Sequence, residues 1–387
     1  MKIAIAIVAY NRKNSLNRLL TSLEQAAYPE ETTLIISIDK SQTNAVEQMA
    51  DNYHWTHGRL HVRKHEKNLG LRRHMLSLGE HFKDFDALIV LEDDITVSPS
   101  FYYYAKACVE KYHDDNRIAG ISLYSYANNY QTFLPFMPAK SEHDVYLMNI
   151  AMSWGQVWMK PAWEKFMLWY ETHSDDFCLP HLPGSINRWP RSSWLKYHIR
   201  YCIEENKYFV YPYFSFSTNN ADLGENFDHT DTMFQANMPV TLIKDFRLPD
   251  ADDIEVRYDG FYQPKYIGRH LGIPEEELCV DLFSDKPECL YRHYVLSNRL
   301  LPYKVVKSYA LQMRPIEQNV ICQRKGSELF LYDTTIEAKP PIQPDRYLTY
   351  TYFYQQAFFK LRTMVGARKV LDIIKNTIIT KTKHSRR

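Results

Sequence analysis

Hydrophobic residues in the first hundred positions form short runs of β-forming residues, and each run is followed by a helical repeat. The run Ile3–Ala9 precedes leucines 16, 19, 20 and 23, and further runs lie at 33–38, near 60–62 and at 87–91. Helices are expected at about 45–53, 71–82 and 101–112. Strands that alternate with helices form a doubly wound parallel sheet, because the crossovers are right-handed. The sequence therefore predicts an α/β fold.

Polar residues stand where the predicted strands end. Arg12 follows the first strand, Asp39 ends the second, Arg72 and Arg73 open the helix after the third, and Glu92, Asp93 and Asp94 end the run at 87–91. In a parallel sheet, ligands bind where the carboxyl ends of the strands meet. Adjacent carboxylates are not buried without compensation, so a cation or a hydrogen-bonded ligand is expected beside the acids. A solvated acidic turn is the alternative interpretation.

The pattern beyond the acids continues more irregularly. Strands are expected at 118–123, 145–150 and 208–217, and helices at 163–170 and 192–206, with a loop-rich stretch at 172–194. Residues 153–158 are aromatic, as a sugar-binding platform would be. The pattern weakens near residue 239, so we expect one domain at 1–238 and a smaller helical and irregular part at 239–387, which ends in a basic amphipathic tail.

Composition and the first turn narrow the classes of function. A net charge of +1 argues against a nucleic-acid binder, and six scattered cysteines without CxxC spacing indicate neither a zinc site nor a disulfide framework. The turn after the first strand, at 10–13, has no glycine, which argues against a dinucleotide-binding oxidoreductase. No segment looks long enough to span a bilayer, and Ile3–Ala9 is expected to be a strand rather than a signal peptide.

These features indicate a cytoplasmic protein with free thiols. The tail at 370–387 has isoleucines on one helical face and many lysines and arginines, so it is expected either to lie on the cytoplasmic membrane face or to be a packing helix with a frayed basic end.

The motifs together resemble the nucleotide-sugar-dependent glycosyltransferases of the GT-A fold, particularly family 2 and N-acetylglucosaminyltransferase I. The resemblance covers about the first 230 residues. It rests on the opening at 7–12 (Ile-Val-Ala-Tyr-Asn-Arg), the strand end at Asp39 and the segment at 91–102, with looser matches at 120–122, 154–155, 189–190 and 214–219 leading to His229. It implies a GT-A, Rossmann-like, mostly parallel sheet flanked by helices.

The resemblance also implies roles for individual residues. The donor nucleotide sugar would be bound by seven residues: Tyr10, Arg12, Asp39, Arg73, His74, Glu92 and Asp93. Asp94 and His229 would hold Mn²⁺ or Mg²⁺ on the diphosphate. A divalent cation stabilises the charge that develops on the leaving phosphate oxygen, which explains why carboxylates are needed at this strand end.

An inverting transfer also needs a carboxylate base near the acceptor hydroxyl. N-acetylglucosaminyltransferase I has an acidic pair shortly after its Trp-Pro segment, but the matching positions here are Leu195 and Lys196. The base is therefore not assigned by the resemblance. Asp175 and Asp176 are the first candidates, and Asp222 and Glu225 are the second.

The expected function is transfer of a hexose or N-acetylhexosamine, from a UDP-sugar above all, to a glycan or lipid-linked acceptor in surface polysaccharide synthesis. One alternative is a non-catalytic carbohydrate-binding protein of the same fold, which the missing acidic pair favours. A sugar nucleotidyltransferase is the other, although such enzymes generally need a glycine-rich first loop that this sequence lacks.

Overall fold

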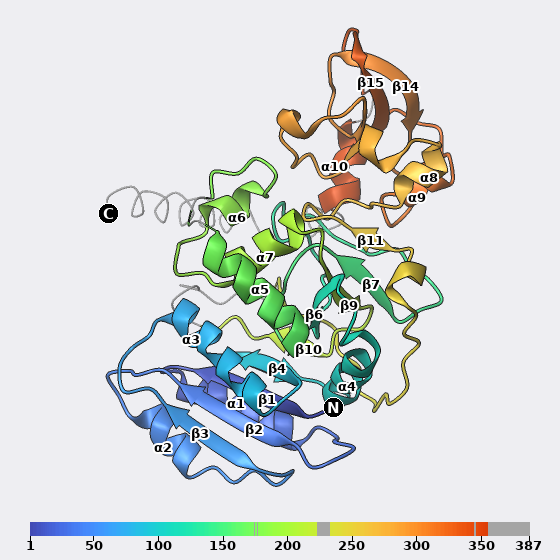
Figure 1. The fold of residues 1–387 in the computed structure, drawn as a ribbon. Coiled ribbons are helices and arrows are strands. Elements are labelled where there is room, and N and C mark those ends of the chain that lie inside the picture. The colour runs from blue at the N-terminus through green and yellow to red at the C-terminus, as the bar shows by residue number, and fades with distance from the viewer. Residues whose placement is uncertain (174, 176, 223–232, 344–345, 355–387) are drawn as a thin grey trace, which may run out of the picture.

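A nine-stranded sheet forms the body of the protein (Figure 1). The structure is a computed structural model that describes residues 1–173, 175, 177–222, 233–343 and 346–354. The strand order is β11-β7-β9-β6-β8-β4-β1-β2-β3, with β3 at one edge and β11 at the other. The predicted α/β fold, with a large sheet flanked by helices, is confirmed.

The first half of the sheet is parallel and follows the hydrophobic pattern closely. Its elements are β1 (Ile3–Ala9), α1 (Lys13–Glu24), β2 (Thr33–Ile38), α2 (Ala45–Asp51), β3 (Leu60–Lys64), α3 (Leu71–Ser77) and β4 (Ala87–Glu92). Strand β1 is buried at every position because it lies between β2 and β4. The pairs Ala9↔Ile38 and Val8↔Glu92 align the carboxyl ends of these three strands at one edge.

The helix expected at 71–82 is divided in two. After Ser77 the chain continues as a 3-10 helix, Leu78–Lys83. Gly79 lies in this second part, and a Cβ built on it would stand 2.4 Å from Nε1 of Trp163. The missing side chain thus lets the Trp163 ring approach the backbone, and glycine is also a poor former of regular α-helix.

The second half of the sheet is mixed rather than parallel. It is formed by β6 (Ile118–Ser122), β7 (Val145–Met148), β8 (Gln156–Met159), β9 (Tyr208–Pro212) and β11 (Arg257–Tyr258). Strand β8 is antiparallel to both of its neighbours, β4 and β6. The helices are α4 (Phe101–Tyr112), α5 (Lys160–Thr172), α6 (Gly184–Arg188) and α7 (Leu195–Glu204), and α5 contacts α7, β6 and β8.

A small two-stranded sheet follows the acids, where the sequence predicted a direct passage from strand to helix. It pairs β5 (Ile95–Val97) with β10 (Ser217–Asn219) in antiparallel register. The cap position of α4 is Ser100, with no side-chain capping bond. The acids therefore lie in the turn between β4 and β5, which a segment from more than a hundred residues later holds in place.

The C-terminal part differs from the helical and irregular expectation because it contains a four-stranded sheet, β12-β13-β15-β14. Its strands and short helices are β12 (Leu278–Asp281), β13 (Tyr294–Ser297), β14 (Tyr303–Tyr309), β15 (Leu329–Glu337), α8 (Ile267–Leu271), α9 (Gln318–Ile321) and α10 (Arg346–Tyr354). Several of these strands mix apolar and charged residues, which weakens the period-two signal. Strand β11 lies in the main sheet although it follows residue 238, where we expected the boundary.

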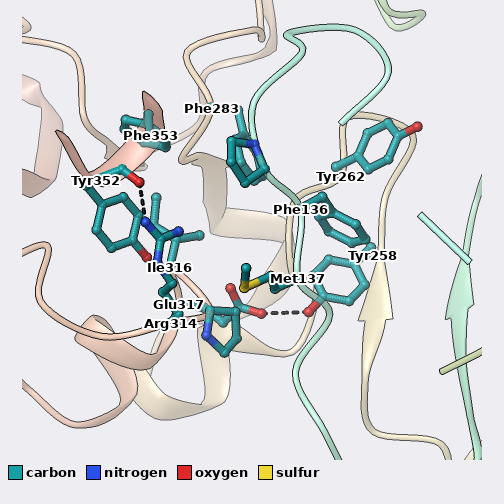
Figure 2. A pocket seen from close by; sticks show the side chains of 12 residues that line it. Phe136, Met137, Tyr258, Tyr262, Phe283, Arg314, Ile316, Glu317, Tyr352 and Phe353 are labelled. Atoms are coloured by element: carbon teal, nitrogen blue, oxygen red, sulfur yellow. Dashed lines mark hydrogen bonds between the residues drawn. The ribbon is translucent and has the colours of Figure 1, made fainter. Parts of the chain in front are cut away.

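The C-terminal sheet lies beyond β7 and β11, at the end of the main sheet farthest from β3 (Figure 1). A buried glutamate, Glu317, links the two parts by accepting hydrogen bonds from the hydroxyls of Tyr258 at 2.6 Å and Tyr266 at 2.8 Å. Figure 2 shows the Tyr258 contact within an otherwise largely aromatic and aliphatic pocket. Burial raises the pKa of Glu317.

Two composition-based expectations can be compared with the structure. The six cysteines, all of which lie in the described ranges, form no disulfide. Within the described ranges, no helix combines the length and apolar character that a membrane span requires. The basic tail at 370–387 lies outside the described residues.

Candidate active site

The carboxyl ends of β1, β2 and β4 bring together polar residues that are far apart in the sequence. Asp93 and Asp94, in the turn after β4, are 2% and 3% exposed. Arg12, at the N-terminal cap position of α1, pairs with Asp93 and also with Asp94, where Nη1 donates to Oδ2 at 3.0 Å. The predicted gathering of Arg12 with the acidic turn is therefore observed in the structure.

The electrostatics of this cluster are set by burial and by Arg12. Burial, and then the charge of Asp94, raise the pKa of Glu92 to about 8, while the charge of Arg12 and a hydrogen bond from Ser153 oppose this rise. Burial also raises the pKa of Asp93 to about 6, although Arg12 opposes the shift. The backbone of Tyr10 contributes a hydrogen bond to Asp93. Burial acts to lower the pKa of Arg12, but the charges of Asp94 and Asp93 raise it overall.

Asp94 offers one carboxylate oxygen for a further ligand. Its Oδ1 is buried and has no hydrogen-bond partner among the described groups, while Oδ2 is held by Arg12. The backbone oxygen of Asp94 accepts hydrogen bonds from the backbone N–H of Asn220 at 3.0 Å and from its side-chain amide at 2.8 Å. Because a buried carboxylate oxygen without a partner is costly, this one suits a hard divalent cation.

Within the described structure, Asp94 is the one residue of this cluster with a buried, unpartnered carboxylate oxygen available to a metal ion. No group of three or more histidines, cysteines and acids there could hold a metal ion. His229, the other expected ligand, lies outside the described residues. Asp94 would thus be one protein ligand, with the remaining coordination positions open to phosphate oxygens and water, as is usual for Mg²⁺.

Asp39 organises the loop that leads into α3. Its Oδ1 accepts hydrogen bonds from the backbone N–H groups of Lys40 at 2.9 Å and Leu69 at 2.8 Å, and Oδ2 accepts from Gly70 at 3.0 Å. Gly70 has φ +74, a left-handed conformation that favours glycine. The carboxylate therefore fixes the backbone beside the strand ends.

His74 and Arg73 lie in different surroundings, although the sequence suggested either for a donor contact. His74 is 2% exposed and lies 2.8 Å from the Ser37 hydroxyl of β2, and burial lowers its pKa to about 4. Its neutral ring therefore packs against the sheet. Arg73 is exposed. Their proposed contacts with a donor stay predictions.

Arg72, which was not assigned a role, reaches across to the helical side of the site. Its guanidinium donates to the Tyr197 hydroxyl and lies 3.5 Å from Asp175. The hydroxyl of Tyr197 also donates to Asp175, at 2.7 Å. The hydrogen bond from Tyr197 lowers the pKa of Asp175 despite some burial, and Arg72 adds to the shift. No sequence signal linked Arg72 with α7.

Of the other three candidate bases, Asp222 lies within the described residues. Asp222 accepts hydrogen bonds from Ser15 at 2.6 Å and from Arg18. Burial raises the pKa of Asp222, but the Arg18 and Ser15 bonds outweigh it and lower the pKa. A lowered pKa makes a carboxylate a weaker base. Asp176 and Glu225 lie outside the described residues.

Comparisons with known proteins find a family similarity for the N-terminal part of the chain. Residues 4–152 match the family model described as Glycosyl transferase family 2. The comparison with curated proteins gives no match.

Several solved structures show a distant likeness. TarS of S. aureus in complex with UDP-GlcNAc has 17% identity and a TM-score of 0.27, over 39% of this chain and 35% of that chain. The mannosyltransferase PcManGT from Pyrobaculum calidifontis, in complex with GDP-Man and Mn²⁺, has 12% identity and a TM-score of 0.31, over 42% of this chain and 46% of that chain. GalNAc-T7 with UDP, GalNAc and Mn²⁺ has 15% identity and a TM-score of 0.37, over 55% of this chain and 42% of that chain.

The matched region thus spans less than half of each of these proteins, and we draw no conclusion about activity from such low scores. The similarity to N-acetylglucosaminyltransferase I stays a prediction. The family match includes the first strand, Asp39 and the acidic turn, which are the motifs that carried the resemblance. Over residues 4–152 the chain is therefore similar to glycosyl transferase family 2.

Proposed function

We propose that this protein is a glycosyltransferase that moves a sugar from a nucleotide-sugar donor to a hydroxyl group of an acceptor. The observation that carries the proposal is the buried acidic turn after β4, paired with Arg12 and located within the family match. The carboxyl ends of adjacent parallel strands are the usual place for a nucleotide ligand in an α/β sheet.

The donor would lie along the edge formed by β1, β2 and β4. Arg12 pairs with Asp93 and Asp94, and Asp39 fixes the loop at 68–70 at the end of the adjoining strand, so both residues lie along the proposed donor edge. Glu92 and Asp93 offer carboxylates for hydroxyl groups of the sugar and ribose. Tyr10, Arg73 and His74 remain further candidates for donor contacts.

Asp94, with its unpartnered Oδ1, would hold Mn²⁺ or Mg²⁺, and His229 is the proposed second ligand. When bound, such an ion supplies charge stabilisation to the leaving diphosphate. The protein's own contribution is to hold the carboxylate in position. Arg12 donates to the other oxygen, Oδ2, and Asn220 anchors the backbone of the turn.

For the base of an inverting transfer, Asp175 stays the first candidate, with Asp176, Asp222 and Glu225 as alternatives. Asp175 is 45% exposed at its side chain, which leaves it accessible to an acceptor. The hydrogen bond from Tyr197, with the charge of Arg72, makes it a weak base in the free protein. A conformational change that parts Asp175 from Tyr197 and Arg72 would be needed to raise its basicity.

The finer features of the function rest on the resemblance. We propose a UDP-sugar as donor, a hexose or N-acetylhexosamine as the transferred group, and a glycan or lipid-linked acceptor of surface polysaccharide synthesis. We also propose a catalytic domain at 1–238 with a C-terminal extension at 239–387, and peripheral contact of its basic tail with the cytoplasmic membrane face.

The test is release of UDP from UDP-sugars in the presence of Mn²⁺, for the full chain and for an Asp94→Asn variant. We expect the variant to lose at least about a hundredfold in rate, as is typical when an electrostatic stabiliser is removed. Asp144→Asn, which changes an aspartate on the distant strand-β7 side that pairs with Arg247, is the matched control. Full activity of Asp94→Asn would contradict the proposal.

Two alternatives predict different outcomes in the same assay. Release of pyrophosphate from a nucleoside triphosphate and a sugar phosphate would identify a nucleotidyltransferase. Glycan binding without turnover of any nucleotide sugar would identify a non-catalytic carbohydrate-binding protein.

A further inference from the structure

A hollow of about 770 Å³ lies beside α6 and the start of α7, on the side of the site that Arg72 reaches. The residues that line it and matter here are Asp175, Phe177, Arg188, Trp189, Arg191 and Lys196. Among the described lining residues there are three cations and one carboxylate. That carboxylate, Asp175, is already engaged by Arg72 and Tyr197.

Lys196 is the deepest of these cations. The residue is 2% exposed, and its Nζ donates to the backbone oxygen of Trp189 at 2.6 Å. The same ammonium group lies 3.8 Å from the centre of the Phe177 ring. An ammonium group has three N–H donors, so these two contacts leave capacity for a further acceptor.

Burial of the Lys196 ammonium group has an electrostatic cost. Burial lowers the pKa of Lys196, and the nearby charges of Arg191 and Arg72 lower it further, while Asp175 opposes the shift. A buried cation without a full counter-charge is unfavourable unless the site gains something from it. An anionic ligand in the hollow would supply the missing charge.

The two arginines at the rim are exposed. Within the part of the chain that the structure describes, neither Arg188 nor Arg191 forms an ion pair, although the charge of Arg188 opposes the rise that burial causes in the pKa of Asp285. The ten-residue helix α7 also begins at the hollow, one residue before Lys196, and its N-terminus carries partial positive charge. The hollow is thus electropositive from several directions.

A chain of aromatic rings connects the hollow with the acidic turn. The Trp189 ring lies 5.8 Å from that of Tyr130, which lies 6.0 Å from that of Trp154. Trp154 follows Ser153, the residue that hydrogen-bonds Glu92. Aromatic rings present flat apolar surfaces on which the apolar faces of sugar rings can pack. Charge and aromatic surface therefore occur together, as recognition of a charged sugar requires.

We propose that the hollow is the subsite for an anionic glycan acceptor, whose carboxylate or phosphate groups bind Lys196, Arg188 and Arg191 while a sugar ring packs on Trp189. The proposal rests on the proposed function and narrows its acceptor to an acidic class. It also accounts for a lysine at the position where the resemblance led us to expect a carboxylate, because a lysine there binds an acid instead of removing a proton.

The test is isothermal titration of the full chain, with UDP and Mn²⁺ present, against defined probes. The carboxylate probe is trigalacturonate, its uncharged match is the methyl ester of the same trisaccharide, and the phosphate probe is a glycerol phosphate trimer. We expect at least one of the acidic probes to bind about tenfold or more tightly than the ester, as charge-assisted hydrogen bonds imply. Its affinity should fall as salt rises from about 50 to about 300 mM.

Substitutions test which side chains bind the acidic probe. Lys196→Met keeps most of the buried volume and removes the charge, and Arg191→Gln changes an exposed residue that packing does not depend on. Each should weaken binding of the acidic probe by about tenfold. Arg247→Gln is the matched control, since Arg247 is 71% exposed at its side chain, pairs with Asp144 and does not line the hollow. It should bind the probe as the parent does.

Equal binding of the ester and both acidic probes would overturn the proposal, as would unchanged affinity in Lys196→Met and Arg191→Gln. Inorganic phosphate that binds as tightly as the trimers would overturn the glycan component. The two proposals fail separately: UDP release without anion selectivity leaves the glycosyltransferase and removes the acidic acceptor. Selective anion binding without turnover of any nucleotide sugar removes the enzyme and leaves an acidic-glycan site.

Discussion

Arg12 holds two buried carboxylates without any other described cation in contact with them, so its removal is the sharpest test of the site's electrostatics. We consider Arg12→Met, which keeps much of the aliphatic stem and removes the guanidinium. The side chains of Asp93 and Asp94 are 3% and 5% exposed, whereas that of Arg12 is 23% exposed. The variant leaves two carboxylates buried and unpaired.

The magnitude follows from these exposures. Removing one partner of a fully buried ion pair costs about 3 to 5 kcal/mol, and an exposed pair contributes about 1 kcal/mol or less. Because solvent reaches part of Arg12, we expect a loss of about 2 to 3 kcal/mol in the free energy of unfolding at pH 7. The loss cannot grow without limit, because a destabilised carboxylate takes up a proton instead.

The same reasoning predicts how the stability loss of Arg12→Met changes with pH. In the parent protein the pKa of Asp93 is about 6, and without Arg12 it rises further. Both proteins carry an ionised Asp93 only above these pKa values, so the stability difference is largest at high pH. It shrinks as the pH falls from the higher pKa of the variant toward about 6, and below about 6 Asp93 is protonated in both proteins.

Urea unfolding followed by tryptophan fluorescence at pH 7.5 and pH 5 measures both quantities, for the metal-free chain. Arg63→Met is the matched control, because its ion pair with Glu80 is exposed at 27% and 42% of the two side chains and should contribute about 1 kcal/mol or less. An Arg12→Met loss below about 0.5 kcal/mol, or a loss that grows toward pH 5, would refute the reasoning.

Three further predictions concern single positions near the site. Burial lowers the pKa of His198 from 6.5 to about 3, so the native state resists protonation, and the free energy of unfolding falls by about 2 kcal/mol between pH 7 and pH 5. In urea unfolding, His198→Phe should abolish this part of the loss at low pH, and His54→Phe, at an exposed histidine, should not. Asp39→Asn should lower stability by about 1 to 3 kcal/mol in thermal or urea unfolding, since both carboxylate oxygens accept backbone N–H groups and an amide nitrogen would face one of them in either orientation. Gly155→Ala should lower the free energy of unfolding by about 1 to 3 kcal/mol in the same assay, because φ is +92 and the new Cβ would stand 2.7 Å from Oγ of Ser217. An unchanged unfolding midpoint in either variant would contradict the prediction for that variant.

The strand and helix order of the first half was readable because its signals are local. In β1, β2 and β4 an apolar run reports burial on both faces, and the leucine spacing of α1 reports one buried face. Parallel crossovers then leave little choice of topology. The C-terminal strands lacked such a signal because solvent reaches many of their residues, as in the alternating burial of β14.

The acidic turn could be recognised, but its partners could not. Arg12 and Asp94 are 82 positions apart, and Ser15 and Asp222 are 207 apart. The sequence indicated that Arg12 would be near the acids, since both follow strands of one sheet. It did not indicate that one guanidinium would pair with two aspartates, or that Arg72 would reach Tyr197.

By itself the sequence determined which segments become strands and helices in the first half, and that polar residues follow those strands, because these properties depend on neighbours a few residues away. Only the tertiary structure decided that Asp94 keeps an oxygen without a partner among the described groups, that His74 turns into the sheet, and that Lys196 is buried beside a hollow. The physical reason is that hydrogen bonding, burial and charge are set by whichever groups the folded chain brings within a few ångströms, and those groups are distant in the sequence.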